Sequence, residues 1–169
     1  MAAIILEPVS TQSQIDTLCA IAKTVWHETY DDLLPPGQPD YMIEKFQSDH
    51  AVKEQMAREN YRYVLAKLGD AYVGFVGYAP RYQGQEEMYL SKAYILPQGR
   101  GQGVVGALFR LVEEETKKEG LSRVRLTVNK GNAHAKAVYE HYGYRTVEAV
   151  QSDIGGGYVM DDYVMVKEL

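Results

Sequence analysis

A glycine-rich segment in the middle of the chain has the residue types of a phosphate-binding turn. Residues 97–109 read Pro-Gln-Gly-Arg-Gly-Gln-Gly-Val-Val-Gly-Ala-Leu-Phe, between an apolar run at 89–96 and an amphipathic run at 104–115. Glycine lets the backbone approach a ligand closely and adopt positive φ. The first turn of a helix offers unpaired N–H groups and the positive end of the helix dipole. A strand, a glycine turn and a helix start, in this order, predict a phosphate site.

Two classes of ligand fit such a turn. Gly101, Gly103 and Gly106 satisfy G-x-G-x-x-G, which indicates a dinucleotide. A dinucleotide fold also needs an acidic residue at the end of the next strand to hold the ribose. The next expected strand, 123–128, is followed by Asn129 and Lys130 instead. The dinucleotide interpretation therefore lacks the acidic residue that would bind the ribose.

The other interpretation rests on a resemblance. Pro-x-x-Arg-Gly-x-Gly-Val-x-x-x-Leu-Phe at 97–109 resembles the pyrophosphate loop of the GCN5-related N-acetyltransferases (GNAT), which bind acetyl-coenzyme A (acetyl-CoA). Residues 132–144, Asn-Ala-His-Ala-Lys-Ala-Val-Tyr-Glu-His-Tyr-Gly-Tyr, resemble the Asn-x-x-Ala-x-x-x-Tyr-Glu-x-x-Gly-Phe segment of the same family. The two motifs in this order favour the acetyltransferase over the dinucleotide protein.

The resemblance implies which residues hold the cofactor. The pyrophosphate falls to the backbone of Arg100, Gly101, Gln102, Gly103, Val104 and Val105, plus Ala107, and Gly106 is also expected to contact the cofactor. The main chain of Tyr94 and Ile95 pairs with the pantetheine arm, because buried backbone groups must find partners. The family usually has Gly or Ala where this chain has Val105, and a branched side chain there could crowd the phosphates. A glycine turn that serves packing alone is the alternative.

Acetyl transfer to an amine also needs a general acid and a route for the proton of the ammonium group. The resemblance makes Tyr139 the general acid for the departing thiolate, since a phenol is protonated at neutral pH. Asn132 is expected to cap helix 133–142 and to touch the cofactor. Glu87 is the candidate general base, with a surface role as the alternative, because Tyr89 stands where relatives have Glu. Cys19 is expected to be a packed core thiol, so direct attack of the amine is predicted.

The acceptor is expected near the end of the first helix, where the family usually receives it. The candidate residues are His27, Glu28, Tyr30, Asp31 and Asp32. Segments 26–30, 40–46 and 153–165 resemble the bacterial spermidine/spermine N-acetyltransferase branch. Carboxylates with interleaved tyrosines suit a polyamine, and a solvated acidic loop is the alternative.

Composition limits the remaining possibilities. The 169 residues carry a net charge of −5; residues 92–130 have eight Lys/Arg and four Glu, which leaves −9 for the rest. A basic segment suits a polyanionic cofactor and an acidic remainder suits a cationic partner, whereas nucleic-acid binding is disfavoured. The single cysteine favours a reducing compartment, and the N-terminus lacks the features of a signal peptide. A cytoplasmic protein is expected, with no metal site and no membrane contact.

The apolar periodicity predicts one α/β domain over residues 1–169. Strands are expected at 3–7, 61–68, 71–79, 86–96, 123–128, 144–151 and 157–167. Helices are expected from Thr11 or Ser13 to Glu28, and at 40–46, 49–58, 103–119 and 133–142, with a loop at Pro35–Pro39. The order matches the GNAT acyl-CoA N-acyltransferase fold, a mixed sheet of about seven strands with helices on both faces. In that fold a splayed parallel pair of strands holds the cofactor.

The amino-acid sequence leaves three functions open. The first is an acetyl-CoA-dependent N-acetyltransferase, an acyltransferase acting on a small primary amine. The second is a CoA-binding module that has lost catalysis, favoured by Tyr89 and Val105. The third is an acetyltransferase of peptide or protein N-termini. The sequence also leaves the oligomeric state open, a homodimer included.

Overall fold

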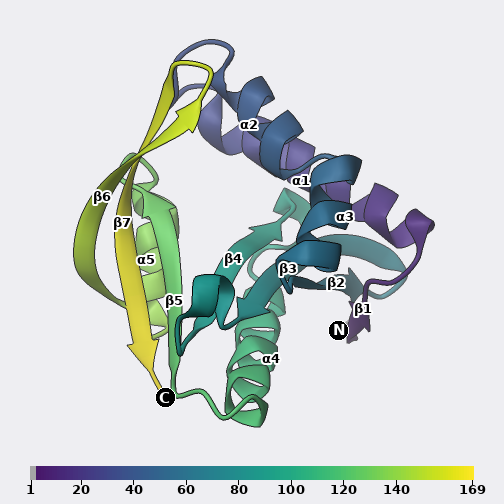
Figure 1. The fold of residues 1–169 in the computed structure, drawn as a ribbon. Helices are drawn as coiled ribbons and strands as arrows, with labels where there is room; N and C mark the ends of the chain where they lie inside the picture. Colours follow the sequence, from purple (N-terminus) through teal and green to yellow (C-terminus); the bar gives the residue numbers. More distant parts are fainter. Residues whose placement is uncertain (1–2) are drawn as a thin grey trace.

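The computed structural model describes residues 3–169, so Met1 and Ala2 of the expected domain lie outside the described residues. Seven strands form one mixed sheet in the order β1-β2-β3-β4-β5-β7-β6 (Figure 1). The strands are β1 (Ile4–Pro8), β2 (Arg62–Leu68), β3 (Ala71–Pro80), β4 (Met88–Ile95), β5 (Arg123–Asn129), β6 (Arg145–Gly155) and β7 (Tyr158–Glu168). The helices are α1 (Gln12–Tyr30), α2 (Gln38–Phe46), α3 (Asp49–Arg58), α4 (Val104–Lys118) and α5 (Ala133–His141). This confirms the predicted seven-stranded α/β fold.

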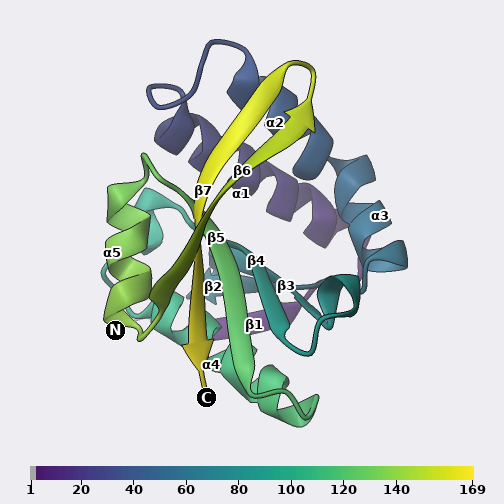
Figure 2. The same ribbon diagram turned by 60° about the vertical axis from the view of Figure 1, so that its left-hand side comes forward.

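Helices cover both faces of the sheet, and each face has its own core. On one face α1 packs on β2 and β3 through residues such as Leu18, Ala22 and Phe75. On the other face α4 packs through Leu108, Phe109 and neighbours onto the inner strands, and α5 lies beside it (Figure 2). Because the apolar residues of the inner strands point alternately to the two cores, these strands are buried on both sides.

The parallel pair β4–β5 opens soon after it begins. Its register joins Met88 to Val124 and Tyr89 to Arg125, and the described part of the chain has no further pairing between the two strands. From there β4 follows β3 while β5 follows β7, so the two halves of the sheet diverge (Figure 1). The predicted splayed pair is therefore present, and it leaves one side of the second half of β4 without a partner strand.

The boundaries of two elements differ from those expected. The loop predicted at Pro35–Pro39 ends earlier, because α2 already begins at Gln38. Pro39 lies in the first turn of this helix, where a missing N–H costs no hydrogen bond. The strand predicted to end at residue 151 continues to Gly155, since it pairs with β7 almost to the turn.

The long β6–β7 hairpin reaches the helices at the far side of the molecule. Its tip contains Gly155, Gly156 and Gly157, all with positive φ. The Tyr41 hydroxyl of α2 donates to the carbonyl of Ile154 at 2.9 Å, and the rings of Tyr41 and Tyr158 lie 5.0 Å apart. The hairpin tip and α2 therefore form an arch between the two halves of the molecule (Figure 1).

None of the helices within residues 3–169 combines the length and apolarity needed to span a bilayer.

Candidate functional site

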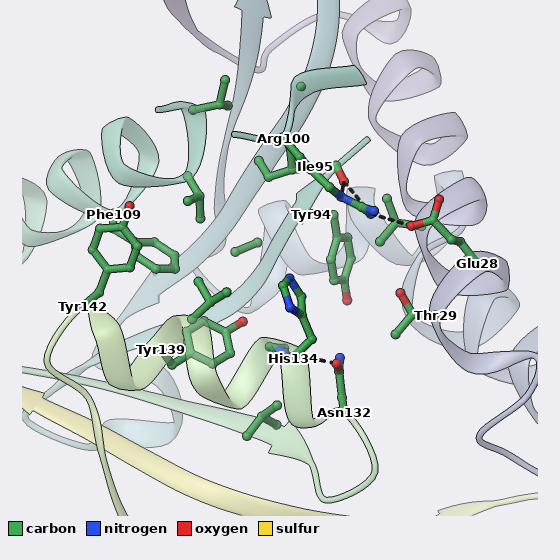
Figure 3. Close-up of a pocket in the computed structure, with 18 of the residues that line it drawn as sticks. Glu28, Thr29, Tyr94, Ile95, Arg100, Phe109, Asn132, His134, Tyr139 and Tyr142 are labelled. Atoms are coloured by element: carbon green, nitrogen blue, oxygen red, sulfur yellow. Dashed lines mark hydrogen bonds and ion pairs between the residues drawn. The ribbon is translucent and has the colours of Figure 1, made fainter. Parts of the chain in front are cut away.

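A pocket of about 660 Å³ lies at the opening between β4 and β5. Residues from both faces of the sheet line it: Glu28, Thr29 and Tyr30 from α1 on one side, and Phe109 and Tyr139 from α4 and α5 on the other. Figure 3 shows Thr29, Phe109 and Tyr139 around a common space, each from a separate helix. The pocket therefore passes through the sheet, which only the separation of the two strands makes possible.

The glycine turn forms one end of this pocket. Gly101 and Gly103 have φ of 72° and 84°, a region that residues with a side chain rarely adopt. Gly103 is the N-cap of α4, and no side chain caps the helix, so its first N–H groups are free to bind a ligand. Arg100, Val104 and Val105 also line the pocket. The predicted phosphate turn thus has the backbone that such a site needs.

Two residues of the predicted turn lie away from the pocket lining. Gln102 donates its side-chain amide to the carbonyl of Gln98 at 2.9 Å. Gly106 lies inside α4, where an added Cβ would stand 3.0 Å from the hydroxyl of Tyr142. Its missing side chain therefore allows α4 and α5 to approach each other, and its expected contact with the cofactor stays a prediction.

The Arg100 side chain joins the turn to β4 and α1. Its guanidinium donates two hydrogen bonds to the carbonyl of Ile95, at 3.1 and 3.2 Å, and forms an ion pair with Glu28. Figure 3 shows this pair crossing one side of the pocket. Glu28 is thus neutralised by a cation of the turn, and the second half of β4 is fixed beside it.

The end of β4 presents both main chain and a buried phenol. Tyr94 and Ile95 line the pocket on the side where β4 has no partner strand. The Tyr94 hydroxyl accepts a hydrogen bond from Nε1 of Trp26 at 2.9 Å and one from Gln47 at 3.3 Å. Burial raises the pKa of Tyr94, so this phenol is protonated at neutral pH. Its side chain also packs against the cores on the α1 side of the sheet.

Tyr139 lies in the wall formed by α5. Its ring stacks on Phe109 with centroids 5.8 Å apart, and Figure 3 shows its hydroxyl directed into the pocket. Burial is the main cause that raises its pKa above the ordinary value of a phenol. The group is therefore a proton donor at neutral pH.

Asn132 caps α5 and reaches across the pocket. Its side-chain oxygen accepts from the backbone N–H of Ala135 at 3.2 Å, so the predicted capping role is confirmed. Its amide nitrogen lies 3.4 Å from the hydroxyl of Tyr30, whose pKa is raised by burial. His134, in the first turn of the same helix, points its ring into the pocket (Figure 3). No spacing in the sequence distinguishes His134, because it holds a variable position of its motif.

The predicted general base is not at this site. Glu87 precedes β4 at the closed end of the β4–β5 pair and forms an ion pair with Arg123 at 3.5 Å. It is absent from the pocket lining, as is Tyr89, whose ring stacks on Tyr82 at 4.7 Å. β4 extends away from Glu87 toward the pocket, so this carboxylate lies outside the pocket lining. Its role as general base stays a prediction, and the pocket lining does not favour it.

The acidic residues expected to receive the acceptor are only partly brought together. Glu28 and Tyr30 line the pocket, whereas His27, Asp31 and Asp32 do not. His27 instead contacts Asp31 and Asp40 through its two ring nitrogens, at 2.8 and 3.3 Å. The contact of His27, Asp31 and Asp32 with the acceptor therefore stays a prediction that the pocket lining does not support.

A second hollow, of about 510 Å³, lies beside the first. It is bounded by the α1–α2 loop at Leu33 and Leu34, the end of β5, and the hairpin at Tyr158 and Asp161. Asp161 pairs with Lys130 at 3.0 Å. The walls of this hollow are thus mostly apolar, with one neutralised ion pair.

The chemistry also depends on whether a thiolate or a metal ion could take part. Burial raises the pKa of the Cys19 thiol to about 11, so it is not a thiolate at neutral pH, and it lies outside the pocket lining. Over residues 3–169, no cluster of three His, Cys, Asp or Glu side chains is arranged to hold a metal ion.

The chain is similar to known acetyltransferases. The model of the family described as "Acetyltransferase (GNAT) family" matches residues 25–144. An uncharacterised N-acetyltransferase of Mycobacterium bovis is 36% identical over 95 residues, which is 56% of this chain and 60% of that relative. The chain therefore aligns with less than two thirds of that curated relative.

Solved structures show the same fold over nearly the full length. The PaiA N-acetyltransferase of Thermoplasma acidophilum, in complex with coenzyme A, has a TM-score of 0.79 at 19% identity, with 99% of each chain covered. A GCN5-related N-acetyltransferase of Rhodopseudomonas palustris has a TM-score of 0.80 at 16% identity, covering 100% of this chain and 98% of that one. At such identities the likeness concerns the fold.

Proposed function

The chain belongs to the GNAT family of acetyltransferases, and from that membership we propose that it transfers the acetyl group of acetyl-CoA directly to a primary amine. One observation carries the proposal: a pocket with a glycine turn at one end passes through the sheet between the separated strands β4 and β5. A cofactor bound there would be reached by an acceptor that enters from the α1 side.

The residues of the turn fit a coenzyme A diphosphate. An added Cβ at Gly101 would meet no atom within 4 Å, so the backbone there is open to a bulky ligand. The uncapped N–H groups at the start of α4 and the dipole of this 15-residue helix favour a negative charge beside Val104 and Val105. The main chain of Tyr94 and Ile95 would hold the pantetheine arm. Bound acetyl-CoA supplies the activated acetyl thioester.

The remaining steps fall to side chains of this protein. Tyr139 holds a proton over the pocket and donates it to the departing sulfur. Asn132 fixes the start of α5, and with it the direction of Tyr139. The protonated and remote thiol of Cys19 supports direct attack by the amine over a covalent enzyme intermediate.

For the acceptor we propose a primary amine that arrives as an ammonium ion, with a polyamine as the finer form. The acidic balance of the chain outside residues 92–130 supports a cation. Glu28 is already paired with Arg100, and Asp161 with Lys130. These two carboxylates therefore give little support to binding of the second ammonium group that a polyamine would carry. The lone cysteine supports the cytoplasm as the compartment.

The release of free thiol from acetyl-CoA tests this function. Polyamines, monoamines, aminoglycosides, amino acids and peptides are compared as acceptors, with calorimetry of coenzyme A and NAD beside them. We expect coenzyme A to bind, NAD not to bind, and thiol release to require an amine. Binding of coenzyme A without turnover of any amine would identify a CoA-binding module. Preference for peptides with free N-termini would favour the protein acetyltransferase.

A further inference from the structure

Direct attack by an amine needs a group that takes a proton from the acceptor's ammonium ion. Such a group must reach the pocket and be able to accept a proton at neutral pH. Most titratable side chains of the lining fail the second condition. The phenols of Tyr30, Tyr94 and Tyr139 keep their protons, because burial raises their pKa. Glu28 is already paired with the guanidinium of Arg100. The base must therefore be a different side chain of the lining.

His134 meets both conditions. It lines the pocket and is exposed, so a ligand in the pocket can reach it. In Figure 3 its ring stands in the open space between Tyr139 and Thr29, and no hydrogen bond or ion pair joins the ring to the other residues drawn. Histidine is the side chain that ordinarily gains and loses its proton between about pH 5 and 8. A free imidazole in this pocket is thus available as a base.

The start of α5 lies close to α1, the side from which the acceptor would enter. The amide nitrogen of Asn132, the N-cap, is 3.4 Å from the hydroxyl of Tyr30 on α1. His134 follows in the first turn of the helix. Tyr139 lies farther along and stacks on Phe109 of α4. One helix therefore carries the imidazole near α1 and the phenol near α4.

The spacing of the two groups on α5 suits a reacting thioester between them. His134 and Tyr139 are five positions apart, which corresponds to about 7.5 Å along a helix axis. A base and an acid must each come within about 3 Å of the atom with which they exchange a proton. The amine nitrogen, the acetyl carbon and the sulfur between those atoms span only a few bond lengths. The two side chains can therefore contact opposite ends of the same reacting group.

On the premise of the proposed acetyl transfer, we propose that His134 receives the acceptor's ammonium group and takes its first proton as the general base. The nitrogen then forms its bond to the acetyl carbon while the bond from carbon to sulfur breaks. Tyr139 gives its phenolic proton to the sulfur and is reprotonated by the second proton that the nitrogen loses. The proton on His134 leaves to solvent, which reaches this exposed side chain, so each turnover releases one proton.

The charges around His134 allow a cation to approach. The charged groups and buried phenols that share the pocket with it are Glu28, Arg100, Tyr30, Tyr94 and Tyr139. The first two neutralise each other, and the three phenols are uncharged. On its own helix, Lys136 pairs with Glu140 at 3.4 Å and faces the ring of Tyr163 on β7. An ammonium group therefore meets no unpaired lysine or arginine within the described pocket lining.

The test compares His134→Gln with His141→Gln, a matched control at the end of the same helix. The ring of His141 contacts Tyr142 and lies outside the pocket lining. His134→Gln should lower kcat by about 10²-fold, the usual effect of losing a general base. In the unmutated protein, kcat should rise with pH between about pH 5 and 8, where imidazoles lose their proton. His134→Gln should lack this rise, and His141→Gln should keep both the rate and the profile.

A second variant separates a proton recipient from a side chain that merely shapes the pocket. His134→Ala leaves space for free imidazole, which should restore part of the rate in proportion to its unprotonated fraction. Calorimetry should show equal coenzyme A affinity in His134→Gln and the unmutated protein. A pH profile of His134→Gln parallel to that of the unmutated protein, or a loss of coenzyme A affinity that accounts for its slower rate, would overturn the role of His134. Failure of the unmutated protein to bind coenzyme A would instead refute the proposed function.

Discussion

At the scale of single residues, burial decides which groups can exchange protons. Tyr94 and Tyr139 lie in the pocket wall, and burial keeps both phenols protonated. Tyr94 is already held by Trp26 and Gln47, whereas the hydroxyl of Tyr139 is directed into the open space (Figure 3). The phenol that is free of fixed partners is therefore the one suited to donate a proton.

Replacement of this phenol tests the assignment. Tyr139→Phe keeps the ring stacked on Phe109 and removes only the hydroxyl. We expect kcat to fall by about 10²-fold, because a general acid contributes this much, with the KM for acetyl-CoA unchanged. Steady-state thiol release measures both. Cys19→Ala serves as the control and should retain full activity. An unaltered kcat in Tyr139→Phe would remove this residue from the mechanism.

The carboxyl of Asp162, which lies on β7 opposite Asn129, predicts a dependence of stability on pH. Its pKa of about 6 lies above the ordinary value for Asp, so the folded state binds its proton more tightly than the unfolded chain does. The stability that protonated Asp162 contributes is present below about pH 4 and is lost as the pH rises through about 6. Asp162→Asn should therefore melt higher than the unmutated protein at pH 7.5, but not at pH 4.

The size of this gain is modest because solvent reaches part of the carboxyl. After allowance for that screening we expect about 1 kcal/mol, or roughly 2–4 °C in melting temperature. Thermal melts at the two pH values measure it. Asp161→Asn removes only the smaller cause of the raised pKa and also loses an exposed pair with Lys130, so its gain should be smaller than that of Asp162→Asn. An equal gain for Asp162→Asn at both pH values would contradict the raised pKa.

At the scale of elements, the turn before α4 performs two tasks through different glycines. Gly101 and Gly103 adopt positive φ and leave the helix N-terminus open to a ligand. Gly106 lets α4 pack closely on Tyr142 of the α5 segment. A pattern of three glycines that resembles one motif is thus divided between a proposed binding role and a packing role.

The two ends of α4 offer a matched pair of substitutions. Gly103→Ala and Gly120→Ala both place a side chain at positive φ, with φ of 84° and 73°. Each should cost about 1–2 kcal/mol of stability for the same backbone reason. Only Gly103→Ala should also weaken coenzyme A binding, by about 10-fold or more, because it disturbs N–H groups that would face the phosphates.

Calorimetry with coenzyme A and thermal melts separate the two effects. Equal coenzyme A affinity in Gly103→Ala and Gly120→Ala would place the phosphates elsewhere. A loss of affinity in both variants would show that α4 as a whole was disturbed.

At the scale of the whole molecule, the separation of the sheet into two halves creates the pocket. The arch of α2 and the β6–β7 hairpin joins these halves on the α1 side through Tyr41, Ile154 and Tyr158 (Figure 1). Several basic residues of 92–130 pair with acidic residues outside that segment, as Arg100 does with Glu28 and Lys130 with Asp161. Ligand binding should therefore stabilise the fold across both halves.

Thermal melts with coenzyme A test this coupling. At a concentration 100 times the Kd, a ligand adds about 2.7 kcal/mol, which corresponds to roughly 5–11 °C for a chain of this size. The shift at a fixed coenzyme A concentration should shrink in 1 M NaCl, because the screening length falls to about 3 Å. NAD is the control ligand and should give no shift. A shift with NAD equal to that with coenzyme A would favour the dinucleotide interpretation.

Local sequence determined the order of elements, the glycine turn, the cap at Asn132 and the family resemblance. These features depend on neighbouring residues: apolar periodicity, the φ freedom of glycine and the reach of a side chain to its own helix start. The tertiary structure alone decided that Glu87 lies at the closed end of β4 and that His27 contacts Asp40 instead of lining the pocket. Those placements depend on where two strands separate and on which face each residue occupies. Since a shift of one residue in register reverses that face, pairing across the sheet had to be known first.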